Sequence, residues 1–95
     1  MPKGYWIVHI DVTDPGAYEA YRKAVVPYLA ANGGVFIVRA GRANPVEGAL
    51  KPRHVMIEFP DYEKALSAYE SADYQAIKAL RLHASRADFV VVEGA

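Results

Sequence analysis

The side chains best suited to acid–base chemistry are two histidines and a glutamate in segments expected to be neighbouring strands. His9 lies in Tyr5–Val12, and His54 and Glu58 lie in Arg53–Phe59. Side chains alternate between the faces of a strand, so all three are expected on one face of the sheet. If the two strands start level, Glu58 lies beside His9, where a carboxylate orients the imidazole and raises its basicity. His9, His54 and Glu58 are therefore the candidate catalytic residues.

Two other interpretations of these residues stay open. A histidine and a glutamate also form structural ion pairs that only satisfy each other at an interface. Two histidines and a carboxylate also match a set of metal ligands. Against a metal, His54 and Glu58 are separated by about 13 Å of strand, whereas both ligands of one ion must lie about 2 Å from it. We therefore expect no metal, and no motif indicates a cofactor.

A second group of residues suits the binding of a small molecule. Arg39 is expected on the same sheet face, and Arg42 and Arg53 flank the loop that follows it. Arginines that converge at a loop mouth can hold a carboxylate or phosphate through paired hydrogen bonds; solvated charges or interface salt bridges are the alternative. Tyr21 and Tyr69 lie on expected helices and either line a pocket or pack in the core. Arg39, Arg42, Tyr69 and Tyr21 are the candidate ligand-binding residues.

The hydrophobic pattern predicts the order βαββαβ for the elements that position these residues. Strands are expected at Tyr5–Val12, Val35–Ala40, Arg53–Phe59 and Phe89–Glu93, with a long loop from Gly41 to Pro52. The helices are expected from Asp14-Pro15 toward Asn32 with a kink or early end near Pro27, then from Pro60-Asp61, then in a short third helix with Tyr74, Ile77, Leu80 and Ala84 facing inward.

With right-handed crossovers, these elements form one ferredoxin-like domain over residues 1–95. The expected architecture is a four-stranded antiparallel sheet with helices on one face. Its first and third strands are expected to be central and parallel to each other. A swapped or differently ordered sheet of the same elements is the alternative.

Both faces of this sheet are largely apolar, although the helices suffice for only one. The face expected under the helices carries Trp6, Val8, Ile10, Val12, Phe36, Val38, Ala40, Val55, Ile57, Phe59, Val90 and Val92. The opposite face carries Tyr5, Ile7, His9, Asp11, Val35, Ile37, Arg39, His54, Met56, Glu58, Phe89, Val91 and Glu93. A second copy packed sheet against sheet is the simplest cover, so we expect a homodimer. A monomer with a partly solvated face is the alternative.

Composition excludes several classes of function. The chain has 95 residues and no cysteine, so disulfides and thiolate chemistry are excluded. Lys+Arg and Asp+Glu number 11 each, which argues against a nucleic-acid or anionic-membrane surface. No apolar run approaches the roughly 20 residues that span a bilayer. We expect a cytoplasmic protein without a nucleic-acid or membrane partner.

Motifs spread along the chain resemble one family. They are Val12-Thr13-Asp14-Pro15, Tyr18, Tyr21-Arg22, Gly33-Gly34, Arg39-Ala40-Gly41, Ile57-Glu58-Phe59-Pro60, Tyr69, Tyr74-Gln75-Ala76, Leu80-Arg81 and Val92-Glu93-Gly94. The chain resembles domain-of-unknown-function family 1330, within the dimeric α+β barrel superfamily, over nearly its whole length. The resemblance implies a ferredoxin-like protomer and a sheet-to-sheet homodimer, but no settled activity. Superfamily relatives include cofactor-free monooxygenases, lactone isomerases and haem-degrading enzymes, so the fold does not fix the function.

The leading hypothesis is a small homodimeric, cofactor-free enzyme, oxygenase- or isomerase-like, or a binder of a small organic molecule. Its pocket would lie between sheet and helices or at the dimer seam. In an enzyme of this kind a histidine would transfer a proton, and arginine or tyrosine would stabilise an anionic intermediate. The alternatives are a non-catalytic dimerisation or interaction module and a ligand sensor.

Overall fold

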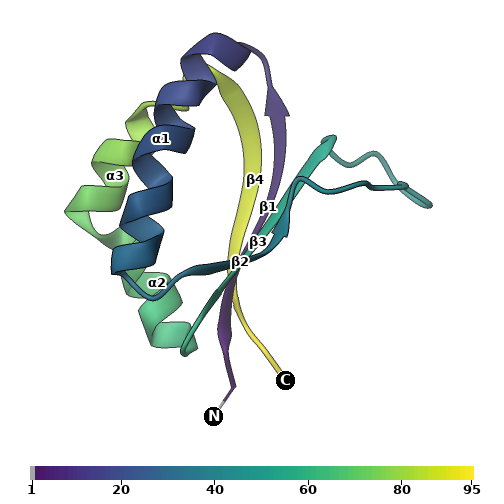
Figure 1. The fold of residues 1–95 in the computed structure, drawn as a ribbon. Coiled ribbons are helices and arrows are strands. Elements are labelled where there is room, and N and C mark those ends of the chain that lie inside the picture. Colours follow the sequence, from purple (N-terminus) through teal and green to yellow (C-terminus); the bar gives the residue numbers. More distant parts are fainter. Residues whose placement is uncertain (1) are drawn as a thin grey trace.

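The computed structural model describes residues 2–95 and places every helix of this range on one face of a single sheet (Figure 1). The elements are β1 (Gly4–Val12), α1 (Pro15–Ala31), β2 (Val35–Arg39), β3 (Arg53–Phe59), α2 (Tyr62–Glu70), α3 (Ala72–Ala79) and β4 (Ser85–Glu93). The four strands are ordered β2-β3-β1-β4. This confirms the predicted ferredoxin-like βαββαβ architecture. Within residues 2–95, no helix has the length and apolar character needed to cross a bilayer.

The predicted parallel pairing of the first and third strands is wrong, because β1 and β3 are antiparallel. The cause lies in the connections. α1 carries the chain back over the sheet, so that β2 runs in the same direction as β1. β3 then returns from β2 as an antiparallel neighbour and lies between the two. Every neighbouring pair in the sheet is consequently antiparallel.

Local sequence signals define both ends of α1. The Asp14 carboxylate accepts a hydrogen bond from the Ala17 backbone N–H at 3.1 Å and caps the first turn. At the other end, the Gly34 N–H donates to the Leu29 carbonyl at 2.9 Å, as a glycine-based helix terminus requires. The predicted early end near Pro27 is wrong, because the helix continues to Ala31. Burial of the flanking apolar face compensates for the hydrogen bond that the proline cannot make.

Trp6 lies at the centre of the core and joins the sheet to the helices. Its side chain is fully buried, and its indole Nε1–H donates to the Ala65 carbonyl of α2 at 2.7 Å. Its ring centroid lies 5.0, 4.9 and 5.1 Å from those of Phe59, Tyr74 and Phe89. One side chain on β1 therefore contacts β3, α3 and β4 as well as α2.

The last third of the chain differs from the sequence prediction. α3 ends at Ala79, and β4 begins at Ser85 rather than at Phe89. Leu80, predicted to face inward, is 45% exposed, because the chain has already left the helix at that point. Ala84 is buried as predicted, but in the turn before β4.

The two faces of β4 are the reverse of those predicted. Val91 pairs with Trp6 and lies on the helix side of the sheet with Phe89. Val90 and Val92 lie on the opposite side, which carries no helix and is called the open face. Strand alternation fixes which residues share a face, but not which face they take. Here both sets are apolar, and the larger Phe89 ring fills the space beside Trp6.

A β-bulge in β2 exchanges two further side chains. Phe36 pairs with Ile57 and Val38 with Met56, which leaves Ile37 as the extra residue. Val38 therefore lies on the open face, and Arg39 lies on the helix side, opposite to the prediction for each.

The open face of the sheet has three cross-strand rows. The middle row is apolar and contains Val38, Met56, Ile7 and Val90. Val35, Glu58, Tyr5 and Val92 form the row on one side of it, and His54, His9 and Asp88 form the row on the other. No helix or strand among residues 2–95 covers these rows, and the loop between β2 and β3 projects away from the body of the protein (Figure 1). The predicted uncovered apolar face is thus present.

We predict that Gly4→Ala strongly destabilises the fold. A Cβ at Gly4 would lie 2.2 Å from the backbone oxygen of Asp61, and backbone cannot move aside as a flexible side chain can. Overpacking of this kind should lower the free energy of unfolding by about 2–3 kcal/mol, measured by urea titration. Gly41→Ala is the matched control, because nothing lies within 4 Å of the added carbon. Equal stabilities of the two variants would contradict the packing at Gly4.

Candidate functional site

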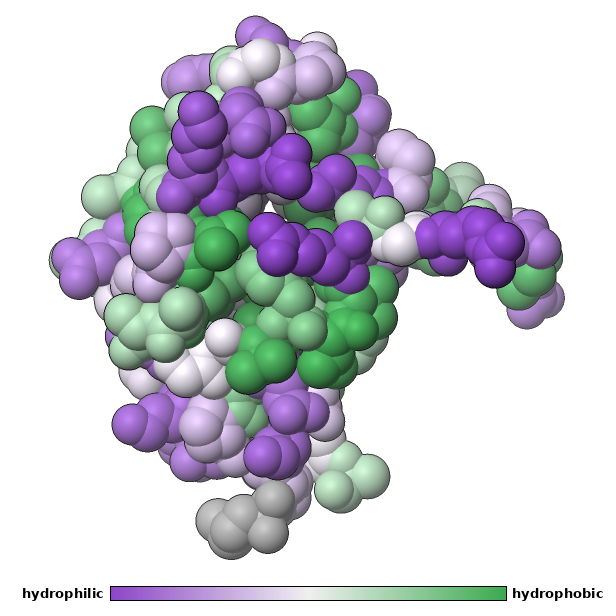
Figure 2. Space-filling view, in the orientation of Figure 1, coloured by the Kyte–Doolittle hydropathy of each residue, from purple (hydrophilic) through white to green (hydrophobic). Residues whose placement is uncertain are grey.

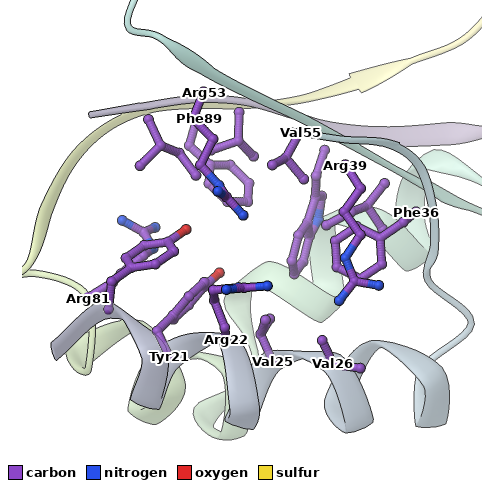
Figure 3. Close-up of a pocket in the computed structure, with 15 residues that line it drawn as sticks. Tyr21, Arg22, Val25, Val26, Phe36, Arg39, Arg53, Val55, Arg81 and Phe89 are labelled. Carbon is purple, nitrogen blue, oxygen red and sulfur yellow. The ribbon is translucent and has the colours of Figure 1, made fainter. Parts of the chain in front are cut away.

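A cavity lies between α1 and the helix-facing side of the sheet (Figure 3). The space available to the centre of a water-sized sphere is about 40 Å³, and all the space between the walls, including solvent at the open mouth, amounts to about 520 Å³. Its lining residues are Trp6, Val8, Ile10, Tyr18, Tyr21, Arg22, Val25, Val26, Phe36, Arg39, Arg53, Val55, Ile57, Arg81 and Phe89. On the surface, Figure 2 shows a hydrophobic area between α1 and the β2 edge of the sheet, bordered and crossed by hydrophilic side chains.

The walls of the cavity are apolar and come from both layers. The sheet contributes side chains such as Val8 and Val55, and α1 contributes Val25 and Val26. Trp6 and Phe89 belong to the aromatic cluster that fills the core behind the cavity. A planar or aliphatic molecule would find complementary surface here, as small-molecule pockets generally provide.

The charged residues of the cavity are all arginines. Arg22, Arg39, Arg53 and Arg81 line it, and none of its lining residues within the described chain is acidic. Arg22 is neutralised by Glu19, whose carboxylate lies 3.1 Å from the guanidinium. The ion pairs found within residues 2–95 include none of the other three. The cavity therefore carries an excess of positive charge.

Two of these arginines stack against aromatic rings. The Arg39 guanidinium carbon lies 4.3 Å from the Phe36 ring centroid, and that of Arg53 lies 5.8 Å from the Tyr18 ring centroid. The Nε atom of Arg53 is buried and has no hydrogen-bond partner among residues 2–95. A buried polar atom without a partner costs free energy unless something else satisfies it.

Arg81 is the most deeply buried of the four, with 6% of its surface exposed. Its guanidinium carbon lies 5.5 Å from the Tyr21 ring centroid and 5.8 Å from that of Phe89. Burial lowers the pKa of Arg81, but the neighbouring Tyr74 and Tyr21 hydroxyls offset this and leave the pKa raised above its ordinary value. The guanidinium thus stays charged although it is buried.

A pair of tyrosine hydroxyls lies beside Arg81. The Tyr21 and Tyr74 oxygens are hydrogen-bonded at 2.8 Å. Burial raises the pKa of Tyr21, and Tyr74 raises it further, whereas Arg81 lowers it in part. The pKa of Tyr18 is also raised by burial and partly lowered by Arg53 and Arg81. These phenols remain protonated at neutral pH, so Tyr18 and Tyr21 can donate hydrogen bonds.

The candidate catalytic residues lie on the opposite face of the sheet from this cavity. His9 pairs with His54 across β1 and β3, and their Nδ1 atoms are 2.8 Å apart. At that distance one ring donates the proton that the other accepts. The expected contact between His9 and Glu58 is wrong, because antiparallel register places Glu58 opposite Tyr5, whose hydroxyl donates to the carboxylate at 3.4 Å.

The candidate ligand-binding residues divide between the cavity and other places. Tyr21 and Arg39 line the cavity, although Arg39 was expected on the open face. Arg42 is exposed in the long loop and does not line the cavity. Tyr69 packs against Trp6, with 6.2 Å between ring centroids, and does not line the cavity either.

Sequence reasoning missed Arg81 as a site residue. Its burial arises from the turn after α3, in which the Ala84 N–H and the Ser85 hydroxyl both donate to the Arg81 carbonyl. The sequence offered two signals, the Leu80-Arg81 pair among the family motifs and an arginine between two leucines, and neither distinguishes a buried arginine from a surface one. Tyr18 appears among the family motifs but was not one of the candidate site residues.

Metal binding finds no support in the geometry of the described chain. Within residues 2–95, no group of three or more histidine, aspartate or glutamate side chains is placed to hold an ion. His54 and Glu58 lie four positions apart along β3, and Asp88 is paired with Lys51. The donor sets present therefore do not fit a metal centre.

The sequence itself assigns the family. Residues 3–95 match the family described as Domain of unknown function (DUF1330). The chain belongs to DUF1330. This confirms the resemblance seen in its motifs. No curated protein matches this DUF1330 chain significantly.

Solved structures show that the DUF1330 chain shares its fold with several proteins. A protein of unknown function from Rhodopseudomonas palustris is 13% identical, with a TM-score of 0.70 over 99% of this chain and 83% of that one. SnoaB, a cofactor-independent oxygenase from Streptomyces nogalater, is 11% identical, with a TM-score of 0.68 over 100% of this chain and 95% of that one. A dimeric ferredoxin-like protein of unknown function from Thermobifida fusca is 18% identical, with a TM-score of 0.62 over 99% of this chain and 91% of that one.

We predict that the buried tyrosines make the DUF1330 protein less stable at high pH. Because the pKa of Tyr21 is raised in the folded state, the unfolded chain loses this proton first as the pH rises above about 10. The free energy of unfolding should then fall with pH. In Tyr21→Phe this fall should be less steep, by up to about 1.4 kcal/mol per pH unit. Urea titrations between pH 8 and 11 measure both slopes, and identical slopes would contradict the burial of a protonated Tyr21.

Proposed function

We propose that this protein binds a small organic molecule in the cavity between α1 and the sheet and acts on it as a cofactor-free enzyme, oxygenase- or isomerase-like. The observation that carries the proposal is an apolar cavity bearing positive charges for which it has no negative partner. Charged groups are not normally buried without a partner for structural purposes alone. The fold similarity to SnoaB, a cofactor-independent oxygenase, supports the choice of chemistry.

The cavity suits reactions in which the substrate gains negative charge. Fixed positive groups and hydrogen-bond donors stabilise a developing anion most effectively where water is excluded. Arg81 and Arg53 supply charge in the cavity, and the protonated Tyr21 hydroxyl supplies a donor. These groups are held by packing, so they need no reorganisation to hold an anionic group of the substrate or a negative charge that develops on it.

The working unit that we propose is a homodimer joined through the open face. The middle row of that face is apolar, and Val90 is 50% exposed in the single chain. Contiguous apolar surface of this kind marks an association site. The described dimeric state of the Thermobifida fusca protein, which shares the fold, supports a dimer as the working unit. A cytoplasmic location remains a prediction.

A second candidate site lies on the open face itself, at the seam of such a dimer. The 2.8 Å contact between His9 and His54 favours it, because two imidazoles that share one proton can deliver or accept it. In that case His9, His54 and Glu58 would act on a substrate held between the protomers. The same contact also fits a non-catalytic module in which the polar row only fixes the register of the two sheets.

We predict that small phenols, lactones and keto acids include ligands that raise the melting temperature of the wild-type protein. At ten times its Kd a ligand stabilises the native state by about 1.4 kcal/mol, which is roughly 5–10 °C for a domain of this size. Val26→Trp should abolish the shift, because Val26 is 36% exposed and lines the mouth of the cavity. Lys23→Trp is the matched control on the exposed side of α1.

The same assay separates the candidate functions. His9→Ala and His54→Ala should leave the shift intact if the cavity is the site, and should remove it if the seam is the site. Catalysis is followed by oxygen uptake and by mass spectrometry of the ligands that bind. If no compound shifts the melting temperature of any form, the small-molecule proposal fails and the interaction module replaces it.

We predict that the wild-type protein sediments as a dimer at micromolar concentration and that Ile7→Lys sediments as a monomer. Ile7 lies in the middle row between Met56 and Val90, so two-fold symmetry would bring two unpaired lysines into one apolar interface. Ala20→Lys on the exposed side of α1 should remain dimeric. A monomeric, folded wild-type protein in analytical ultracentrifugation would refute the assembly.

A further inference from the structure

Arg81 and Arg53 together suggest what kind of ligand the cavity takes. Arg81 is a guanidinium with 6% exposure whose neighbours are the rings of Tyr21 and Phe89 rather than a carboxylate. The Nε of Arg53 is buried and unsatisfied within residues 2–95. The Arg53 guanidinium carbon lies 5.8 Å from the Tyr18 ring centroid, that of Arg81 lies 5.5 Å from the Tyr21 ring centroid, and the two ring centroids are 5.4 Å apart. Both guanidinium groups therefore belong to one region of the cavity.

Residues 2–95 contribute no acidic side chain to the lining of this cavity. One acidic residue, Glu19, lines the adjoining surface depression with Tyr18 and Arg53, but it forms its ion pair with Arg22. Leaving a buried guanidinium without a negative partner is costly, whereas a bidentate carboxylate satisfies two of its N–H groups at once. An anion that enters the cavity from outside would therefore meet an Arg81 guanidinium without a carboxylate partner and an Arg53 Nε without a hydrogen-bond partner.

The geometry points to a monocarboxylate with an aromatic or apolar body as the ligand, its carboxylate held by Arg81 and Arg53 and its body lying against the apolar walls. This assignment rests on the proposed binding function and specifies the ligand for it. Figure 3 shows Arg81 and Tyr21 at one end of the cavity, Arg53 reaching in from the sheet, and Phe36 and Arg39 at the opposite end.

The remaining residues fix the orientation of such a ligand. The Tyr21 hydroxyl already bonds Tyr74 and keeps its proton, so it can donate to the second carboxylate oxygen if Tyr74 donates to Tyr21. Val25 and Val55 form opposite walls from α1 and β3 for the body of the molecule. Arginine suits this role better than lysine, because its planar fork pairs with a planar carboxylate while stacking on aromatic rings.

Matched carboxylate and amide pairs test this assignment on the wild-type protein alone. Benzoate with benzamide, phenylacetate with phenylacetamide, and cinnamate with cinnamamide have nearly the same shape within each pair and differ in charge. Calorimetric titration should give each acid an affinity about 10- to 100-fold higher than its amide, as expected for a charge-assisted hydrogen-bond pair. Equal affinities within every pair would overturn the assignment, although the cavity would still be a binding site.

Charge-removing variants locate the interaction. Arg81→Gln should remove the preference for acid over amide, and Arg81→Lys should restore only part of it, because lysine keeps the charge but lacks the fork. Arg53→Gln serves as a second variant, since Arg53 is less deeply buried than Arg81. Lys23→Gln removes the same charge from the exposed side of α1 and should leave the preference unchanged. Circular dichroism and melting curves verify that each variant is folded.

The outcomes distinguish this inference from the function on which it rests. If acids and amides fail to bind while a phenol or lactone shifts the melting temperature, the ligand assignment falls and the binding function stands; if none of these compounds binds, both fall. If acids bind better than amides but a folded Arg53→Gln and a folded Arg81→Lys keep the full preference, the carboxylate is held elsewhere and the assignment is overturned. Loss of the preference in the cavity variants, with the control unchanged, supports it.

Discussion

The attachment of α1 to α2 and α3 by side-chain hydrogen bonds is the constraint on which the rest of the structure depends. The Tyr28 hydroxyl donates to the Ala68 carbonyl at 2.9 Å and lies 2.6 Å from the Ser71 hydroxyl, at the junction of α2 and α3. Together with the hydroxyl contact between Tyr21 and Tyr74, this holds α1 against its helical neighbours. Meanwhile the Trp6 indole holds α2 against the sheet. Because hydrogen bonds to α2 and α3 hold α1 in place, its inner face does not have to pack tightly against the strands along its whole length. A cavity therefore remains between α1 and the sheet.

The sheet divides the molecule into two chemical environments. Along β1, His9 belongs to the open face, whereas its neighbours Val8 and Ile10 line the cavity. Acid–base groups and apolar surface therefore face one side, and arginines with aromatic rings face the other. A ligand in the cavity and a partner on the open face would contact the same strands from opposite sides. Any coupling between them would pass through a single layer of backbone.

The elements of the fold were predictable because each has a local cause. Asp14 caps α1, the glycines after it end the helix, and the strands are strongly apolar. The sheet face on which a side chain lies was less predictable in strands where both alternating sets of side chains are apolar. Val90 and Val91 are equally suited to the core by composition, and only the pairing with β1 decides between them.

The candidate site was predictable only in part, for physical reasons. Tyr21 was found because a tyrosine on a helix that packs against the sheet either lines a pocket or packs in the core. His9 and His54 were assigned correctly to one face, but their contact depends on antiparallel register, which local sequence does not encode. Arg81 could not be found, because its burial results from tertiary folding of a turn against α1. Long-range geometry, rather than residue type, separates a binding arginine from a solvated one.

The extra residue in β2 has a consequence for how such a protein can change over evolution. The bulge at Ile37 turns Arg39 toward the cavity and Val38 toward the open face. Deleting that one residue would leave both side chains on these faces, because Val38 would then follow Phe36 directly in regular alternation. The bulge therefore absorbs one extra residue without exchanging the guanidinium and the isopropyl group between the ligand chamber and the apolar surface. An edge strand that bulges in this way can gain or lose a single codon while ligand preference and self-association are both kept.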